Sequence, residues 1–99
     1  MKAVRFLDLA RAEYFDAQAF YESRLQGLGD EFLAELEQAL ELLASRPGLG
    51  KPIGARLRSL PLRRFPLSII YTELADNLLI VAVAHQRRRP GYWRRRIGR

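Results

Sequence analysis

Residues 67–84, LSIIYTELADNLLIVAVA, contain the pattern that decides the fold. In residues 67–72 the side chains alternate with a period of two, which is the period of a β-strand. Asp76-Asn77 is a turn dipeptide. Residues 78–84 are apolar throughout, which is typical of a strand that is buried on both faces at the centre of a sheet. Two such runs joined by a short polar turn predict an antiparallel hairpin.

The N-terminal half of the chain predicts a strand followed by two helices. Residues 3–9 alternate with the period of a strand. One apolar stripe at helical spacing then runs from Ala10 to Leu25, and another runs from Phe32 to Leu43. Gly27-Leu28-Gly29 separates the two stripes, and Pro47-Gly48 ends the second one. Two helices with a short glycine joint predict an antiparallel helical hairpin.

The predicted order of elements is therefore β-α-α-β-β-β, an α+β fold in one domain over residues 1–99. The strand that begins at Leu57 precedes the hairpin, and Pro61 and Pro66 limit how far its ladder extends because proline donates no hydrogen bond. Only one helical layer is available, so it covers one face of a small antiparallel sheet and leaves the other face partly open. We look for the functional site on that open face or in a groove beside it.

The composition of the 99 residues excludes several classes of protein. The chain has no Cys and one His, which excludes a disulfide framework and a thiol nucleophile and argues against a multi-ligand transition-metal site. The longest apolar run, residues 78–84, is too short to cross a bilayer. The N-terminus reaches Asp8 and Glu13 without the apolar core of a signal peptide. We expect a cytoplasmic protein with no metal, no cofactor and no membrane partner.

The net charge of +6 is divided unevenly along the chain. Residues 1–46 hold five lysines and arginines against nine aspartates and glutamates, for a net charge of −4, and residues 47–99 hold twelve against two, for +10. A field of that sign attracts a phosphate backbone or an acidic protein. The alternative is an ordinary solvated face. We expect the sheet to gather the late arginines on one electropositive surface.

Three stretches in this order resemble the ParE/RelE superfamily of bacterial toxins from type II toxin–antitoxin, or plasmid stabilisation, modules. They are RPGLG at residues 46–50, LPLRRFPLSIIY at residues 60–71 and HQRRRPGYW at residues 85–93. The resemblance covers nearly the whole chain. It implies a growth-inhibiting toxin that a co-expressed antitoxin holds inactive. RelE-type members cut messenger RNA on the ribosome, whereas ParE-type members inhibit DNA gyrase.

The RelE-like reading makes the protein a metal-independent endoribonuclease. Attack of a 2′-hydroxyl on its phosphate requires a base, an acid and cations for the phosphoryl oxygens. The resemblance assigns this work to Arg64, His85 and Tyr92, with Arg87 or Arg88 beside them. If the last strand runs unbroken through His85, this side chain shares a face with Leu79, Val81 and Val83. The plainer alternatives are a histidine packed at a strand end and an aromatic pair that anchors the tail.

The ParE-like reading is favoured by the scarcity of lysine. RelE-type sites are rich in lysine, whereas this chain has only Lys2 and Lys51. Arginine is a poor proton shuttle because it is effectively always protonated. In this reading the target-binding residues do no chemistry; they are Arg58, Arg63, Arg64, Arg87, Arg88 and Trp93. A third reading, a non-catalytic nucleic-acid-binding module, rests on positive charge alone.

The resemblance also implies a partner. Antitoxins of this superfamily wrap the toxin with a disordered tail that folds on binding, by strand addition or as a helix in a groove. A tail of acidic character suits the basic half of the chain. Phe15 and Phe20 lie off the apolar stripe of the first helix, and we expect them to be the apolar anchors for the antitoxin. The alternative is that both are ordinary core residues.

Overall fold

The hairpin predicted from residues 67–84 lies in the middle of a five-stranded sheet in the computed structural model, which describes residues 2–97. The elements, in chain order, are β1 (Ala3–Phe6), α1 (Asp8–Arg24), α2 (Leu28–Ser45), the short 3-10 helix η1 (Pro47–Leu49), β2 (Lys51–Pro52), β3 (Arg58–Pro61), β4 (Leu67–Glu73), β5 (Asn77–His85) and the 3-10 helix η2 (Arg94–Ile97). The α+β fold is confirmed. The first strand is shorter than predicted, because helix α1 already begins at Asp8.

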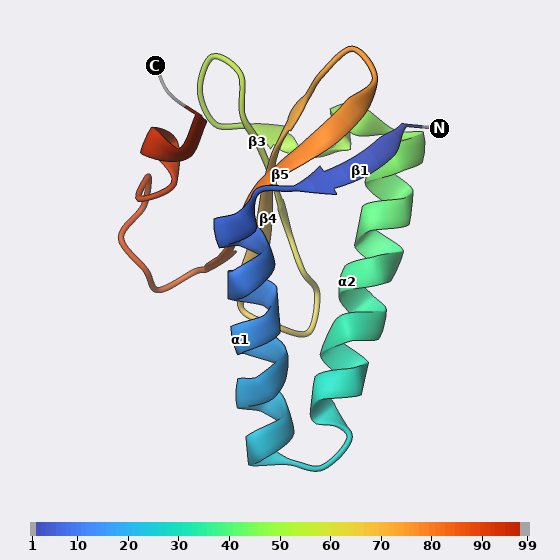
Figure 1. Ribbon diagram of the computed structural model, residues 1–99, viewed down its shortest axis with the longest axis vertical. Helices are drawn as coiled ribbons and strands as arrows, with labels where there is room; N and C mark the ends of the chain where they lie inside the picture. The colour runs from blue at the N-terminus through green and yellow to red at the C-terminus, as the bar shows by residue number, and fades with distance from the viewer. Residues whose placement is uncertain (1, 98–99) are drawn as a thin grey trace.

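The strand order in the sheet is β1-β5-β4-β3-β2 (Figure 1). β5 lies between β1 and β4, and its residues 80–84 are buried, which confirms the prediction of a central strand. β1 pairs with β5 in parallel, with Ala3 opposite Asn77 and Phe6 opposite Ile80. The sheet is therefore mixed: β2, β3, β4 and β5 pair antiparallel, as predicted for the later strands, and the parallel pairing of β1 was not predicted. A parallel pair needs a long crossover connection, which the helical hairpin supplies.

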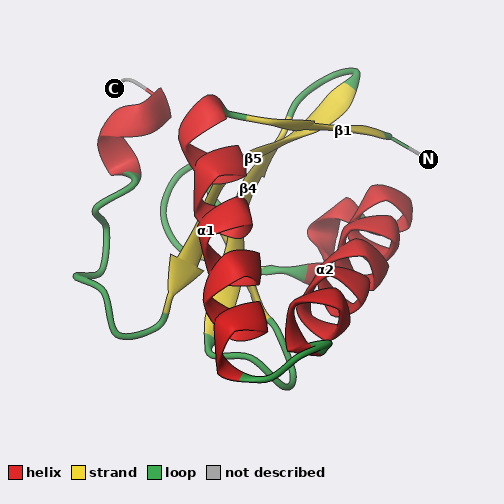
Figure 2. Ribbon diagram, turned by 60° about the horizontal axis from the view of Figure 1, so that its bottom comes forward, coloured by secondary structure: helices red, strands yellow, loops and turns green. Residues whose placement is uncertain are grey.

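The two helices form a single layer on one face of the sheet (Figure 2). Their inner sides and the facing strand residues make the larger core, whose fully buried members include Phe32, Leu36, Ile69 and Tyr71. Gly27 forms the joint with a φ of 90°, a left-handed conformation that favours glycine. At Gly29 a Cβ atom would lie 2.7 Å from the carbonyl oxygen of Gln18. Glycine at this position therefore lets the two helices approach closely.

The loop after α2 contains a strand that the sequence pattern did not predict. β2 is only two residues long and pairs with β3 at Ser59 and Arg58. The Tyr71 hydroxyl fixes this loop, because it accepts a hydrogen bond from the Gly50 amide at 2.8 Å and donates one to the Pro47 carbonyl at 2.7 Å. A Cβ on Gly50 would lie 2.6 Å from the Tyr71 oxygen.

The second face of the sheet, away from the helices, is covered in part by the C-terminal segment (Figure 1). Tyr92, Trp93 and Ile97 pack there on Ile70 and on the β5 residues that face them. The aromatic pair Tyr92-Trp93 therefore anchors the tail, as the alternative interpretation of these residues expected. Within residues 2–97 no helix combines the length and apolar character needed to span a membrane.

A β-bulge in β5 changes which residues share a face. Ile70 of β4 is opposite Ala82, while the next residue, Tyr71, is opposite Ile80, so Val81 is the extra residue. Before the bulge Ile80 belongs to the larger core, and after it Val83 does. His85 therefore lies on the helix-facing side with Val83, and not with Leu79 and Val81 as an unbroken strand predicted.

Candidate functional site

A hydrogen-bonded cluster joins α1 to the C-terminal segment beside β5. The Glu13 carboxylate accepts hydrogen bonds from the Val83 amide at 2.9 Å, from the Tyr92 hydroxyl at 2.6 Å and from both terminal nitrogens of Arg96 at 2.9 Å. Arg96 Nη1 also donates to the Val81 carbonyl at 3.0 Å. The Glu13 and Arg96 side chains are only 14% and 12% exposed. We call these three side chains, Glu13, Tyr92 and Arg96, the Glu13 cluster.

The Glu13 cluster stabilises its carboxylate as an anion. Burial raises the pKa of Glu13, but the hydrogen bonds from Arg96, Tyr92 and Val83 outweigh burial and hold this pKa below its usual value of 4.5. Burial and the bond to Glu13 raise the pKa of Tyr92 to about 12. Tyr92 is therefore a protonated donor at neutral pH. A phenol held in this way gives up its proton with difficulty, which makes it a weak general acid.

The Glu13 cluster also closes an exposed strand edge. Pairing with β1 ends at Phe6 and Ile80, and the Leu7 amide makes the last bond, to the Ile80 carbonyl at 3.0 Å. Beyond that point no strand among residues 2–97 pairs with Val81 and Val83 on this side. Arg96 supplies the missing donor to the Val81 carbonyl, and Glu13 supplies the missing acceptor for the Val83 amide. An unpaired strand edge is a template for pairing with other chains, so this arrangement blunts it.

His85 and Tyr92 line a groove of about 310 Å³ between α1 and the end of β5, together with Phe20 and Arg88. The Arg88 guanidinium lies over the Tyr92 ring at 3.8 Å and 3.7 Å from the Glu13 carboxylate. His85 Nδ1 accepts a hydrogen bond from the Arg87 amide at 3.0 Å. A neutral imidazole whose Nδ1 accepts a hydrogen bond carries its proton on Nε2, so Nε2 can donate to the solvent.

The other predicted arginines lie elsewhere. Arg64, in the turn between β3 and β4, pairs with Glu31 of α2 at 2.6 Å, and the amide of Arg63 donates to Glu35. Arg58 donates to the Gly50 carbonyl at 2.7 Å, beside β2. The expected single arginine surface is therefore divided into separate places. The structure brings His85 and Tyr92 into one groove, and it places Arg64 outside that groove, against the second helix.

Phe15 and Phe20 project from α1 with 52% and 49% of their surface exposed, so they are not core residues. Phe15 stacks on Tyr14 with ring centroids 4.5 Å apart. Phe20 lies under the Arg24 guanidinium at 4.6 Å and borders the groove of His85. Trp93, predicted to bind a target, packs instead in the smaller core and anchors the tail.

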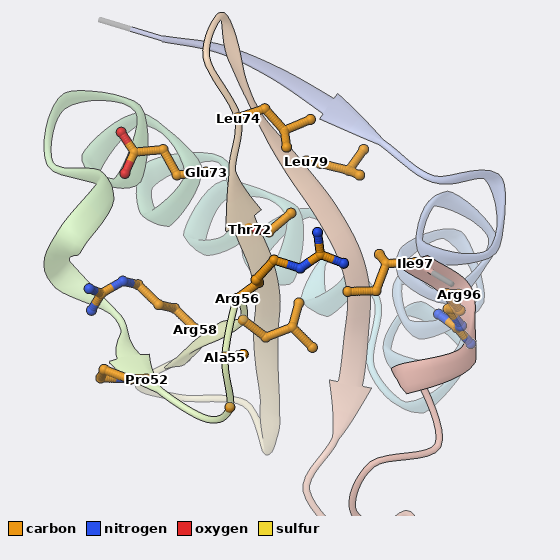
Figure 3. Close-up of a pocket in the computed structure, with 12 residues that line it drawn as sticks. Pro52, Ala55, Arg56, Arg58, Thr72, Glu73, Leu74, Leu79, Arg96 and Ile97 are labelled. Carbon is orange, nitrogen blue, oxygen red and sulfur yellow. The ribbon is translucent and has the colours of Figure 1, made fainter. Parts of the chain in front are cut away.

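A second groove, of about 530 Å³, lies on the face of the sheet away from the helices (Figure 3). Its walls are the loop before β3 and the helix η2, and its floor is formed by the ends of β4 and β5 near their turn. We call it the second-face groove. It lies on the face that the sequence predicted to be partly open.

Glu13 and Arg96 are the principal site residues that sequence reasoning missed. Glu13 occupies an interior position of α1 with ordinary helical surroundings, and Arg96 is one of three consecutive arginines. Their contact joins positions at opposite ends of the chain, and no local pattern indicates it.

The architecture defines a small, basic α+β protein in which a helical hairpin covers one face of a five-stranded sheet. Residues 4–90 match the family described as the ParE toxin of type II toxin–antitoxin system, parDE, so the chain belongs to the ParE toxin family. A chain in a solved structure of the chromosomal ParDE TA system from P. aeruginosa is similar to it, with a TM-score of 0.69 and 20% sequence identity over 86% of this chain and 96% of that one. That likeness supports the fold. No curated protein matches the chain.

Proposed function

We propose that this ParE-family toxin inhibits growth by binding DNA gyrase, without catalysing a reaction of its own. The observation that supports this proposal best is the position of Arg64. Its guanidinium lies 2.6 Å from Glu31, and it lies outside the groove that holds His85 and Tyr92. Arg64 is thus separated from His85 and Tyr92, although an endoribonuclease would use the three side chains together.

The protonation states in the groove agree with a binding role. Metal-independent cleavage of RNA needs a base that accepts the proton of the 2′-hydroxyl and an acid that protonates the leaving oxygen. His85 Nδ1 is already occupied by the Arg87 amide, and the pKa of Tyr92 is raised to about 12. Arg88 beside them supplies positive charge but no proton transfer at neutral pH. The groove is therefore better suited to contact than to acid–base chemistry.

We further propose that the antitoxin is acidic in the segment that wraps the toxin and that Phe15 and Phe20 anchor it. Both rings are half exposed on α1, and exposed aromatic side chains of this size mark binding surfaces. The ParDE system of the similar solved chain pairs a toxin with an antitoxin. The net charge of +10 in residues 47–99 suits an acidic partner.

Two assays separate the gyrase proposal from the ribonuclease reading. Purified toxin is added to a gyrase supercoiling reaction, and the toxin is induced in cells with translation and supercoiling scored separately. We expect supercoiling to be inhibited first, with His85→Ala retaining toxicity and with Arg64→Ala, which removes a predicted target contact, weakening it. Cleavage of ribosome-bound messenger RNA that both substitutions abolish would instead establish an endoribonuclease. If induction causes no growth defect, the protein is instead a non-catalytic nucleic-acid-binding module.

A further inference from the structure

The second-face groove combines an apolar floor with an unpaired positive charge. Leu57, Leu79 and Ile97 contribute apolar surface. Thr72 of β4 lies opposite Leu79 of β5 in the floor of the groove (Figure 3). The Arg56 side chain extends across this floor toward Ile97. Within residues 2–97, the Arg56 guanidinium has no hydrogen-bond or ion-pair partner. A guanidinium in this position offers a planar pair of donors to a carboxylate.

The charges around the groove favour an anionic occupant. Arg94 borders the groove near Gly54 and donates only to the Ile53 carbonyl, so its positive charge is not neutralised. Arg58 also donates only to backbone carbonyls, but its side chain points away from Arg56 (Figure 3). Among residues 2–97, Glu73 is the one carboxylate that lines the groove. It points away from Arg56 (Figure 3) and lies 3.6 Å from Lys2. Arg96 also lines it, but the charge of Arg96 is offset by Glu13.

An occupant must therefore present a carboxylate and an aliphatic group side by side. An acidic peptide with leucine-like side chains does so when a glutamate and a leucine stand two residues apart, since alternate residues of an extended strand lie on the same face. The volume of about 530 Å³ accommodates a few side chains rather than a whole helix.

We propose that the second-face groove binds an acidic, aliphatic segment of the antitoxin, with one of its carboxylates on Arg56. This rests on the proposed function in one respect, the existence of an acidic antitoxin. It adds a contact on the face of the sheet opposite the helices, so that the antitoxin reaches around the toxin from Phe15 and Phe20 on α1 to Arg56.

The test uses two probes and three full-length variants. The first probe is a fluorescent synthetic peptide in which glutamate and leucine take turns at every second position, with serine between them, compared with the same peptide carrying glutamine in place of glutamate. The second is the antitoxin produced from the gene that adjoins the toxin gene. Arg56→Gln removes the charge, and Thr72→Phe fills the groove with a residue that suits a strand. Arg46→Gln is the control. It removes the same charge from an exposed arginine at the end of α2 that does not line the groove.

We expect both Arg56→Gln and Thr72→Phe to weaken binding of the glutamate peptide and of the antitoxin by roughly fivefold, with Arg46→Gln unchanged. Equal weakening by all three variants would reduce the effect to general charge attraction and overturn the proposal. Antitoxin binding that neither groove variant alters would overturn it as well. A toxin that binds the peptide through the groove but shows no toxicity would support the groove while refuting the proposed function.

Discussion

Replacing Glu13 by glutamine is expected to destabilise the protein and to release its C-terminal segment. Glutamine keeps the size of the side chain but leaves Arg96, only 12% exposed, without a counter-charge. It also leaves one fewer acceptor for the Val83 amide and the Tyr92 hydroxyl. The free energy of unfolding should therefore fall markedly.

The magnitude follows from the burial of the pair. Breaking a fully buried ion pair costs about 3–5 kcal/mol, and the slight exposure of Glu13 and Arg96 brings the expected loss to about 2–3 kcal/mol. For a domain of this size such a loss lowers the melting temperature by roughly 8–24 °C. Glu41→Gln is the matched control, since Glu41 is exposed on α2 and should change stability by less than about 0.5 kcal/mol.

Urea unfolding provides the measurement. Circular dichroism follows the helices, and fluorescence follows Trp93, the only tryptophan, which packs in the smaller core with the tail. We expect Trp93 emission of the Glu13→Gln protein to shift to the red at lower urea than the helical signal is lost. A variant within about 0.5 kcal/mol of the wild type, with unaltered Trp93 emission, would refute the role given to Glu13.

Three further predictions follow from individual contacts. Because the folded-state pKa of Glu13 lies below 4.5, its contribution to stability is present above about pH 4.5 and is lost as the pH falls through the folded pKa; the difference in urea midpoint between wild type and Glu13→Gln should shrink on acidification. Because the pKa of Tyr92 is raised to about 12, an ultraviolet titration should show an ionisation near that pH, and Tyr92→Phe should remove it. The stability that the protonated Tyr92 contributes is lost as the pH rises from about 10 through 12. Gly50→Ala should cost about 1–3 kcal/mol, because its Cβ would lie 2.6 Å from the Tyr71 oxygen, whereas Gly48→Ala, with no atom within 4 Å, should be nearly neutral; similar urea midpoints would contradict this.

The sequence predicted the features of the fold that depend on local pattern. Period-two alternation and the Asp76-Asn77 turn were sufficient to find β4 and β5, and glycine and proline marked both ends of α2. β2 was missed because two residues carry no periodicity. The parallel pairing of β1 was missed because alternation reveals that a strand exists but not the direction of its neighbour.

The candidate site was less predictable, because it depends on contacts between distant positions. The extra residue Val81 moved His85 to the helix-facing side, and a run of apolar residues gives no sign of a bulge. Arg64 was expected near His85 from the resemblance, yet Glu31 of α2 holds it elsewhere. The exposure of Phe15 and Phe20 agrees with their position off the apolar stripe.

The pairing of β1 with β5 has a consequence for biosynthesis. Ala3 leaves the ribosome long before its neighbour Asn77 in the sheet, and Arg96 follows later still. The first strand and the helical hairpin must wait for the final strand before the sheet can close, and contacts of such long sequence separation form slowly. Nascent chains thus complete this fold only after β5 and Arg96 have been synthesised.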